Sequence, residues 1–241
     1  MITVVVATKN SGRYLPEALN SLQICRTSIP IEEVLFVDAG STDQTLDVIA
    51  QFGEGRVIKQ ETSGLYNALN EGVTQARGSH VLFLHSDDTI RAWPSECPTF
   101  VSDSVYVGCV DFMRADGTVL FTRFPVRFPR WALRDYPFLF HPNALYPTWA
   151  LKQFPYNEQR FGRKADRYQI AAMAHLVRFR RLPDFVYQFR IHHSSVTAQA
   201  LRGRTREPLA YWLWRAWVIT LWEDRKLARI ARRFRGLRTF Q

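Results

Sequence analysis

The chain has 241 residues, 46% of them apolar, and carries a formal net charge of +10 at pH 7. This length and apolar content allow one sizeable core, built as one domain or as one domain with a small appendage. Three cysteines without metal or redox spacing, Cys25, Cys97 and Cys109, argue against a disulfide framework and favour a reducing, cytoplasmic compartment. The sequence shows neither a signal peptide nor a run of about 18 apolar residues that could span a bilayer.

Four short apolar runs, each followed by polar or turn-forming residues, predict the strands of a parallel sheet. They cover residues 2–7, 34–37, 56–59 and 81–84. Helical patterns separate them at residues 15–22, 46–50 and 65–76. The alternation of strands and helices indicates a doubly wound α/β fold with right-handed crossovers.

The fourth run leads directly into two adjacent carboxylates, Asp87 and Asp88. In an open α/β sheet, ligands bind in the crevice beyond the carboxyl ends of the strands, where Thr8, Asn10 and Asp38 follow two other runs. Neighbouring carboxylates repel each other unless a cation lies beside them. Mg2+ and Mn2+ prefer oxygen ligands and usually arrive bridged to substrate phosphates. The pattern predicts a metal–diphosphate site, although an ordinary polar turn would explain Asp87 and Asp88 taken alone.

Four segments in this part of the chain resemble motifs of the family 2 glycosyltransferases. In the order and at the spacing of that family, they are Ala7-Thr8-Lys9-Asn10, Val37-Asp38-Ala39-Gly40-Ser41-Thr42-Asp43, Gly64-Leu65-Tyr66-Asn67-Ala68-Leu69-Asn70-Glu71-Gly72 and Leu84-His85-Ser86-Asp87-Asp88. The resemblance implies a GT-A type fold, which is a doubly wound, mostly parallel sheet flanked by helices. It also implies inverting transfer of a sugar from a nucleotide-diphosphate donor, for which uridine is the common base of the family. Beyond residue 88 the resemblance is looser.

The resemblance assigns the donor contacts residue by residue. Thr8 and Asp38 would contact the nucleotide base and ribose, while Asn10 and Ser41 would shape the loops around them. A carboxylate that accepts from a base N–H or a ribose hydroxyl makes a charge-assisted contact. Asn67 falls where the family often has Asp, so one negative charge near the donor is missing here.

The same resemblance implies a metal site for Mn2+ or Mg2+. Asp87 matches the metal-binding carboxylate of the Asp-x-Asp element, and Asp88 would be the neighbouring acid that touches sugar or metal. His85 stands where the first acid of that element is expected, which leaves fewer charged ligands on that side.

The middle of the chain is expected to form the acceptor side. Residues 105–110 and 118–124 predict a hairpin around Asp116-Gly117. Residues 124–147 are rich in proline and aromatic residues, which predicts an irregular wall. His141 lies within it and is open to two interpretations, a structural histidine or one near the acceptor.

Asp166 is the candidate catalytic base, because residues 162–170 look like the family segment in which an acid precedes a helix. A structural role as a first-turn acid stays open. Neighbouring Arg163, Lys164 and Arg167 are expected to keep the carboxylate ionised. The inner face of its helix should consist of Ile170, Met173, Ala174 and Val177.

A pair of histidines, His192 and His193, falls where relatives have a Gly-rich loop that closes over the diphosphate. A neutral imidazole can donate to a phosphate or bind an Mn2+-type ion. Adjacent residues on an extended chain point in opposite directions, so one of the two, assigned as His193, would contact the donor. A solvated pair in a loop remains the alternative.

Residues 202–241 form a basic segment, with eleven basic and three acidic residues and therefore a net charge of +8. An apolar block with four tryptophans, residues 209–222, precedes an amphipathic basic pattern. Such segments lie in the interface of an anionic membrane, which predicts peripheral binding to the cytoplasmic face. Packing on the domain or on a second copy is the alternative, and no nucleic-acid motif accompanies the charge.

These observations predict three segments: residues 1–110 as the nucleotide-sugar-binding half, 111–201 as the acceptor half, and 202–241 as the tail. The predicted function is transfer of a sugar from a UDP-sugar to a hydroxyl of a glycan or polyprenyl-linked acceptor in surface polysaccharide biosynthesis. One alternative is a sugar-nucleotide nucleotidyltransferase, which should open with a Gly-rich basic loop. The other is a non-catalytic, membrane-docked nucleotide-sugar-binding protein, suggested by His85 and Asn67.

Overall fold

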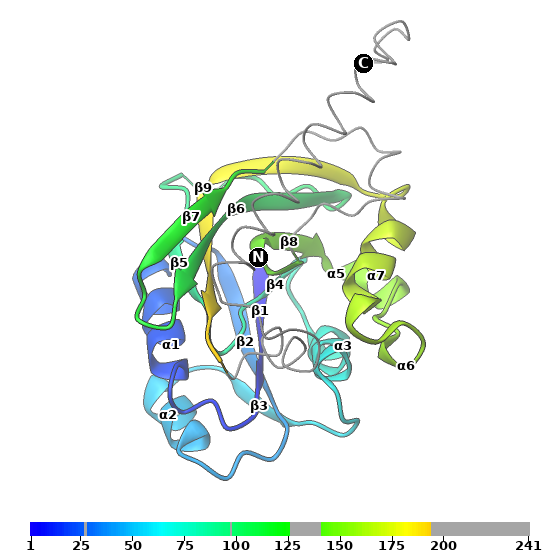
Figure 1. Ribbon diagram of the computed structural model, residues 1–241. Helices are drawn as coiled ribbons and strands as arrows, with labels where there is room; N and C mark the ends of the chain where they lie inside the picture. Colours follow the sequence, from blue (N-terminus) through cyan, green and yellow to red (C-terminus); the bar gives the residue numbers. More distant parts are fainter. Residues whose placement is uncertain (27, 97, 126–140, 194–241) are drawn as a thin grey trace, which may run out of the picture. The chain divides into compact units, whose positions relative to one another are not determined.

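The computed structural model describes residues 1–26, 28–96, 98–125 and 141–193 (Figure 1). The chain divides into two compact units, Met1–Ile191 and His192–Gln241. The second unit contributes two described residues, His192 and His193, and the predicted tail at 202–241 lies outside the described residues. The fold below is therefore that of the first unit.

Within the described residues, nine strands form one sheet in the order β3-β2-β1-β4-β8-β6-β9-β5, and β7 pairs with β6 outside this path. The first four positions are parallel and comprise β3 (Arg56–Lys59), β2 (Ile31–Asp38), β1 (Ile2–Thr8) and β4 (His80–Phe83). The remaining strands are β8 (Ala144–Pro147), β6 (Ser104–Arg114), β9 (Arg178–Ile191), β5 (Thr89–Ala92) and β7 (Val119–Arg123). In this second half antiparallel pairs predominate, with β6 and β9 as a parallel pair.

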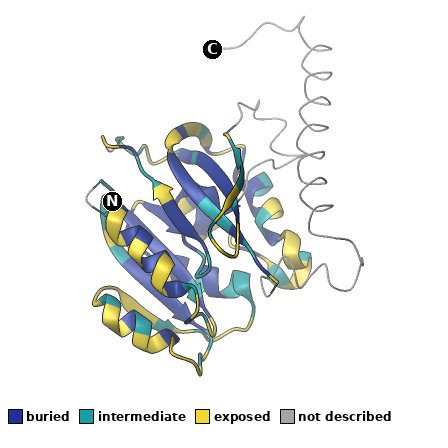
Figure 2. Cartoon of the chain, turned by 60° about the vertical axis from the view of Figure 1, so that its left-hand side comes forward, coloured by how far each residue is buried: buried dark blue, intermediate teal, exposed yellow. Residues whose placement is uncertain are grey.

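Helices cover both faces of the parallel half because its strands are apolar on both sides. Val4 and Val6 of β1 belong to one core, together with α1 (Leu15–Cys25) and α2 (Thr45–Phe52). Val5 belongs to the other core, together with α3 (Leu65–Gln75), α5 (Thr148–Gln153) and α7 (Ala165–Met173). Figure 2 shows the buried strands between helices whose outer sides are exposed. This layering is the doubly wound arrangement expected from apolar runs separated by amphipathic helices.

The close approach of α3 to the sheet depends on one glycine. A Cβ atom at Gly72 would lie 2.5 Å from Cγ1 of Val5 on β1, a separation that packed side chains do not reach. Gly72 therefore lets α3 lie directly on β1 and β2, the strands whose ends carry Thr8 and Asp38.

The predicted α/β fold with its doubly wound parallel half is confirmed, and so is the hairpin, which β6 and β7 form around Gly117 at φ 87°. Most of the irregular segment expected over 124–147, residues 126–140, lies outside the described residues, and the prediction is wrong at its end. Residues 144–147 form β8, which pairs with both β4 and β6 at the centre of the sheet. The predicted division after residue 110 falls inside β6, so both halves share one sheet. Among the described residues, no helix combines the length and apolar character of a membrane span.

Candidate active site

The carboxylate of Asp38, at the end of β2, is the centre of a hydrogen-bond network. Thr8 Oγ1 donates to Oδ1 at 2.9 Å and Ser41 Oγ donates to the same oxygen at 2.6 Å. Backbone N–H groups of Gly40 and Ser41 donate to Oδ2 at 3.0 and 2.8 Å. Burial alone would raise the pKa of Asp38, but these hydrogen bonds outweigh it and lower the pKa. The group is therefore an anion that fixes the end of β1 against the β2–α2 loop.

Asn10 and Ser41 connect the same two loops. Asn10 adopts φ 49°, a left-handed conformation that asparagine tolerates better than most residues. Its backbone N–H donates to Ser41 Oγ at 2.9 Å, and its side-chain oxygen accepts from Thr42 N at 2.9 Å. The predicted nucleotide residues Thr8, Asn10, Asp38 and Ser41 are thus brought together, and their contacts with a nucleotide stay predictions.

The loop after β4, which carries His85 to Asp88, lies beside this hydrogen-bond network. Ser11 Oγ and Ser86 Oγ are 2.8 Å apart and form a hydrogen bond between the two loops. The carboxyl ends of β1, β2 and β4 therefore form one rim, as parallel pairing of these strands requires.

Asp88 and Asp87 differ sharply in their surroundings. Asp88 is fully buried, and its two oxygens accept from Tyr187 Oη and from Arg190 N, each at 2.8 Å. Burial, followed by the charge of Asp87, raises the pKa of Asp88 well above its usual range. Asp87 is partly exposed, and its backbone oxygen accepts from Arg190 Nε at 2.9 Å. The predicted contact of Asp88 with metal or sugar stays a prediction, and it would require this fully buried side chain to become accessible.

Two residues of β9 thus hold the loop, and sequence reasoning missed both. Tyr187 Oη also accepts from His85 N at 3.1 Å, so this hydroxyl bridges the start and the end of the loop. The buried guanidinium of Arg190 pairs with Glu17 at 2.6 Å and lies over the ring of Tyr14. No local motif marks these residues, because their role depends on the pairing of β9 within the sheet.

Asp166, in the first turn of α7, acts electrostatically on the same group as Asp87. Burial lowers the pKa of His85, while the charges of Asp87 and Asp166 both act in the opposite direction. Because both charges act on one imidazole, the candidate base and the candidate metal ligand lie in the same region of the molecule.

The surroundings of Asp166 correct one expectation. The neighbouring basic residues were expected to keep it readily ionised, but burial outweighs Arg167 and raises the pKa of Asp166. Interaction with the Tyr66 side chain acts in the opposite direction to burial, and so does Arg167 N, which donates to Oδ1 at 2.8 Å. The predicted inner residues Ile170, Met173, Ala174 and Val177 are all buried, but α7 ends at Met173, so Ala174 and Val177 follow the helix.

His141 has the environment of a structural histidine. Its Nε2 atom is hydrogen-bonded to Tyr156 Oη, and its ring stacks on Phe83 with centroids 5.0 Å apart. Burial, with a smaller contribution from His85, lowers the pKa of His141 to about 3. The ring is therefore neutral at physiological pH. It lies next to His85 of the loop after β4, with 6.4 Å between the ring centroids.

The described residues contain no group of three or more His, Cys, Asp or Glu side chains that could hold a metal ion. Asp87 is partly exposed at the rim, while Asp88 is fully buried. These residues fit a cation that takes the rest of its ligands from a bound diphosphate, and they do not form an all-protein cage.

Asn67 and His193, which are also predicted to contact the nucleotide-sugar donor, belong to different compact units. Asn67, near the start of α3, donates from Nδ2 to Ser63 O at 2.7 Å. His193 and His192 belong to the second compact unit, which is described by itself, and their rings are perpendicular with centroids 6.5 Å apart. The donor contacts of Asn67 and His193 stay predictions.

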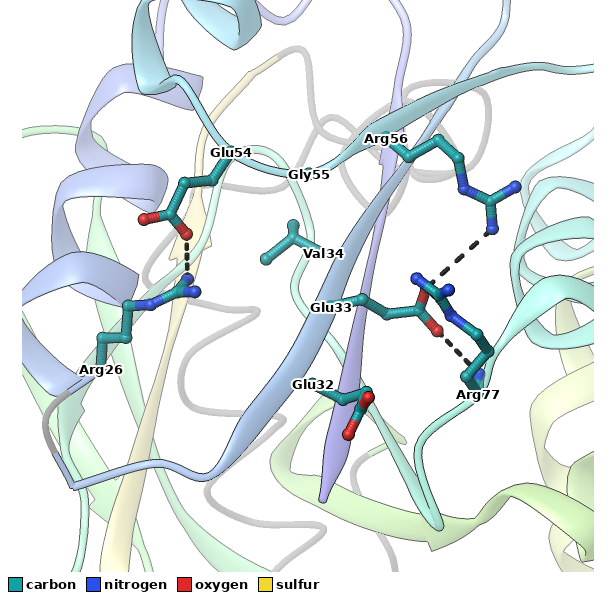
Figure 3. A pocket seen from close by; sticks show the side chains of 8 residues that line it. All are labelled: Arg26, Glu32, Glu33, Val34, Glu54, Gly55, Arg56 and Arg77. Carbon is teal, nitrogen blue, oxygen red and sulfur yellow. Dashed lines mark hydrogen bonds and ion pairs between the residues drawn. The ribbon is translucent and has the colours of Figure 1, made fainter.

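A charged cavity of about 390 Å3 lies at the opposite end of β2 from Asp38 (Figure 3). Its walls carry Glu33, which pairs with Arg77 at 3.0 Å, and Arg26, which pairs with Glu54. Because these acidic and basic groups neutralise one another, the cavity lacks the unbalanced charge expected of a phosphate site.

Comparison with known proteins gives a family match and a fold match. Residues 3–151 match the sequence profile described as "Glycosyl transferase family 2". The "PGL/p-HBAD biosynthesis glycosyltransferase" of Mycobacterium bovis is 35% identical over 113 residues, which cover 45% of this chain and 42% of that protein. "Glycosyltransferase GlyA" of Streptococcus pneumoniae is 39% identical over 94 residues, covering 37% of this chain and 13% of that protein. The chain thus matches less than half the length of each of these relatives.

Among solved structures, S. aureus TarS 1-349 in complex with UDP matches with a TM-score of 0.60 and 24% identity. The match covers 80% of this chain and 61% of that one. The same protein in complex with UDP-GlcNAc matches with a TM-score of 0.57 and 21% identity, over 80% of this chain and 59% of that one. At these identities the likeness concerns the fold.

Tyr187→Phe tests the tether between β9 and the loop. The change removes one hydroxyl and leaves Asp88 Oδ2 and His85 N without this partner, so the free energy of unfolding should fall by about 1–3 kcal/mol. Urea unfolding followed by tryptophan fluorescence measures the loss. Tyr168→Phe is the matched control, because Tyr168 is 50% exposed and should change stability by less than about 0.5 kcal/mol. Equal stability of Tyr187→Phe and the wild type would contradict the tether.

Proposed function

Because this chain belongs to glycosyl transferase family 2, we propose that it is an inverting glycosyltransferase that uses a UDP-sugar donor. The acceptor is a hydroxyl group of a glycan or of a polyprenyl-linked sugar, in surface polysaccharide biosynthesis. Family membership supports the reaction class, and the fold shared with TarS, whose complexes contain UDP and UDP-GlcNAc, supports uridine as the base.

One observation carries the proposal: Asp38 and the loop of Asp87 lie at one rim of the sheet, and Asp166 acts electrostatically on His85 of that loop. Asp38, at the end of β2, accepts a hydrogen bond from Thr8 at the end of β1. The hydrogen bond between Ser11 and Ser86 connects the loop after β1 to the loop of Asp87. The charges of Asp87 and Asp166 both act on His85. In the proposed complex, a nucleotide held at Asp38 has its sugar directed towards Asp166.

The chemistry follows from the roles of these groups. The acceptor oxygen attacks the anomeric carbon while its proton passes to Asp166, and the bond between that carbon and the diphosphate oxygen breaks. Attack from the face opposite the leaving UDP inverts the anomeric configuration. The raised pKa of Asp166 suits this role, because a base works best when its pKa lies closer to the operating pH.

A divalent cation, Mn2+ or Mg2+, would supply charge neutralisation for the departing diphosphate. Asp87 is the residue that would hold it, with diphosphate oxygens as the other ligands. Asp88 supports this arrangement from behind, through its hydrogen bonds with β9.

The basic segment at 202–241 would bind the cytoplasmic face of a membrane and bring the site to a lipid-linked acceptor. Its net charge of +8 and its tryptophans support this part of the proposal. Binding of this kind depends on apolar burial together with attraction to anionic headgroups.

A nucleotide-release assay tests the reaction class. The wild type is expected to release UDP slowly from one member of a UDP-sugar panel, with water as acceptor, in the presence of Mn2+. Asp87→Asn should abolish the response to Mn2+ in both UDP binding and UDP release. Release of pyrophosphate from UTP and a sugar phosphate would instead establish a nucleotidyltransferase. Nucleotide-sugar binding without either release would establish a binding protein.

Asp166→Asn tests the base. The substitution should lower kcat by at least about 100-fold, the lower end of the effect of a general base, while the Kd for UDP stays unchanged. In the wild type, kcat should rise with pH as Asp166 loses its proton. Since the pKa of Asp166 is raised, this acid limb should lie above the pH range of an ordinary aspartate. A pH profile of Asp166→Asn that retains the limb would assign the base to another group.

Charge neutralisation tests the membrane contact. The triple variant Arg229→Gln, Arg232→Gln and Arg233→Gln should bind anionic vesicles more weakly by about 3 kcal/mol at low ionic strength, at about 1 kcal/mol per charge. Vesicle co-sedimentation measures the change. The control removes three exposed charges from the first unit, by Lys59→Gln, Arg114→Gln and Arg181→Gln. Equal losses in both variants would reduce the effect to net charge alone.

A further inference from the structure

The segment that leads to Asp166 is fastened to the first two turns of α3. Asn70 and Tyr156 form a reciprocal pair, in which Asn70 Nδ2 donates to Tyr156 O at 2.8 Å and Tyr156 N donates to Asn70 Oδ1 at 2.9 Å. This pair fixes the chain ten residues before the candidate base.

Glu158 makes the next contact, at the amino end of α3. Its Oε2 atom accepts from Tyr66 N at 2.9 Å and from Asn67 N at 3.3 Å. Backbone N–H groups at a helix start lack partners within the helix and carry partial positive charge, so a carboxylate there is favourable. Gly64 leaves the space, because a Cβ atom at this position would collide with the Glu158 carboxylate. The helix start is therefore capped by a residue from the acceptor half.

Tyr66 makes the last contact, at the base itself. Its hydroxyl donates to Arg163 O at 3.2 Å, three residues before Asp166, and its interaction with the Asp166 carboxylate lowers the pKa of that group. Its ring packs against Tyr156, with centroids 5.2 Å apart. Contacts from α3 thus hold the chain from Tyr156 to Asp166.

The position of α3 gives these contacts a consequence for catalysis. Leu69 and Val73 of α3 share a core with Val5 and Val37, which lie on β1 and β2. The strands that end in the candidate nucleotide residues and the segment that carries the candidate base are therefore fixed to the same helix. Transfer needs both groups at a defined separation, because the attacking hydroxyl must lie within about 3 Å of the base.

We propose that Tyr66 and Glu158 are positioning residues for the transfer reaction: Glu158 caps α3 from the acceptor half, and Tyr66 orients the Asp166 carboxylate towards the acceptor hydroxyl. This inference rests on the proposed function, in which Asp166 is the base. It gives residues Gly64–Asn70, part of the family motif that runs from Gly64 to Gly72, a structural role distinct from binding the sugar donor.

Tyr66→Phe isolates the hydroxyl. It should lower kcat for UDP release from UDP-GlcNAc by about 10- to 100-fold, the loss expected for one hydrogen bond to a charged group. The KM for UDP-GlcNAc should stay unchanged, since donor binding is untouched. Because the Tyr66 side chain lowers the pKa of Asp166, loss of its hydroxyl should move the acid limb of kcat to higher pH. Tyr168→Phe, at a half-exposed position of the same helix as Asp166, should leave both quantities as in the wild type.

Glu158 is tested by a pair of variants. Glu158→Ala removes the acceptor for two backbone N–H groups and should lower kcat with an unchanged KM. Glu158→Gln keeps an acceptor oxygen at the same length and should recover most of the lost activity. Equal kcat in the alanine variant and the wild type would overturn the role of Glu158. If Glu158→Ala fails to fold, Glu158→Asp, whose shorter side chain should not reach both N–H groups, takes its place: a lowered kcat with an unchanged KM supports the role, and a wild-type kcat overturns it.

A measurement without turnover separates this inference from the proposed function. The carboxyl 13C resonance of Asp166, assigned by its loss in Asp166→Asn, is titrated in the wild type and in Tyr66→Phe. A higher pKa in Tyr66→Phe supports the positioning role, and identical titrations overturn it. A wild type that releases UDP from no UDP-sugar would defeat the proposed function, whereas this titration would still show whether Tyr66 holds Asp166.

Discussion

Two hydrogen bonds to a fully buried carboxylate join the antiparallel half of the sheet to the loop that carries Asp87. Tyr187 Oη and Arg190 N donate to Asp88, and Arg190 Nε reaches the backbone oxygen of Asp87. A buried carboxylate is costly unless its oxygens are hydrogen-bonded, so β9 cannot leave the loop without a large loss of stability. Since β9 also pairs with β5 and β6, the position of Asp87 depends on the whole second half of the sheet.

The contacts of α3 with Tyr156, Glu158 and Arg163 form a second connection between the halves. The two connections differ in kind. The first buries a charge inside the sheet, while the second places a carboxylate at a helix end, where part of the interaction is with backbone N–H groups. Together they place groups from distant parts of the chain around one rim. The separation of candidate base and candidate metal ligand is thus fixed by packing between the halves.

The parallel half of the fold could be predicted because its signals are local. Apolar runs, amphipathic helices and polar strand ends predicted the rim of Thr8, Asp38 and Asp87, and β3 begins and ends at the predicted residues. β8 and β9 were missed because their position depends on pairing across the sheet, which periodicity does not encode. The roles of Tyr187, Arg190 and Glu158 were missed for the same reason. The raised pKa of Asp166 was also missed, because the sequence shows neighbouring arginines but not burial.

Asp38 and Asp166 show how the surroundings give two carboxylates different properties. Asp38 has little exposed surface, yet its pKa is lowered, because Thr8, Gly40 and Ser41 donate hydrogen bonds to its oxygens. Asp166 receives fewer hydrogen bonds, and burial raises its pKa. A carboxylate saturated with donors has little tendency to take a proton, so it serves as a fixed anion. One with fewer donors and a raised pKa accepts a proton more readily. This difference is the one that the proposed proton-accepting role of Asp166 requires.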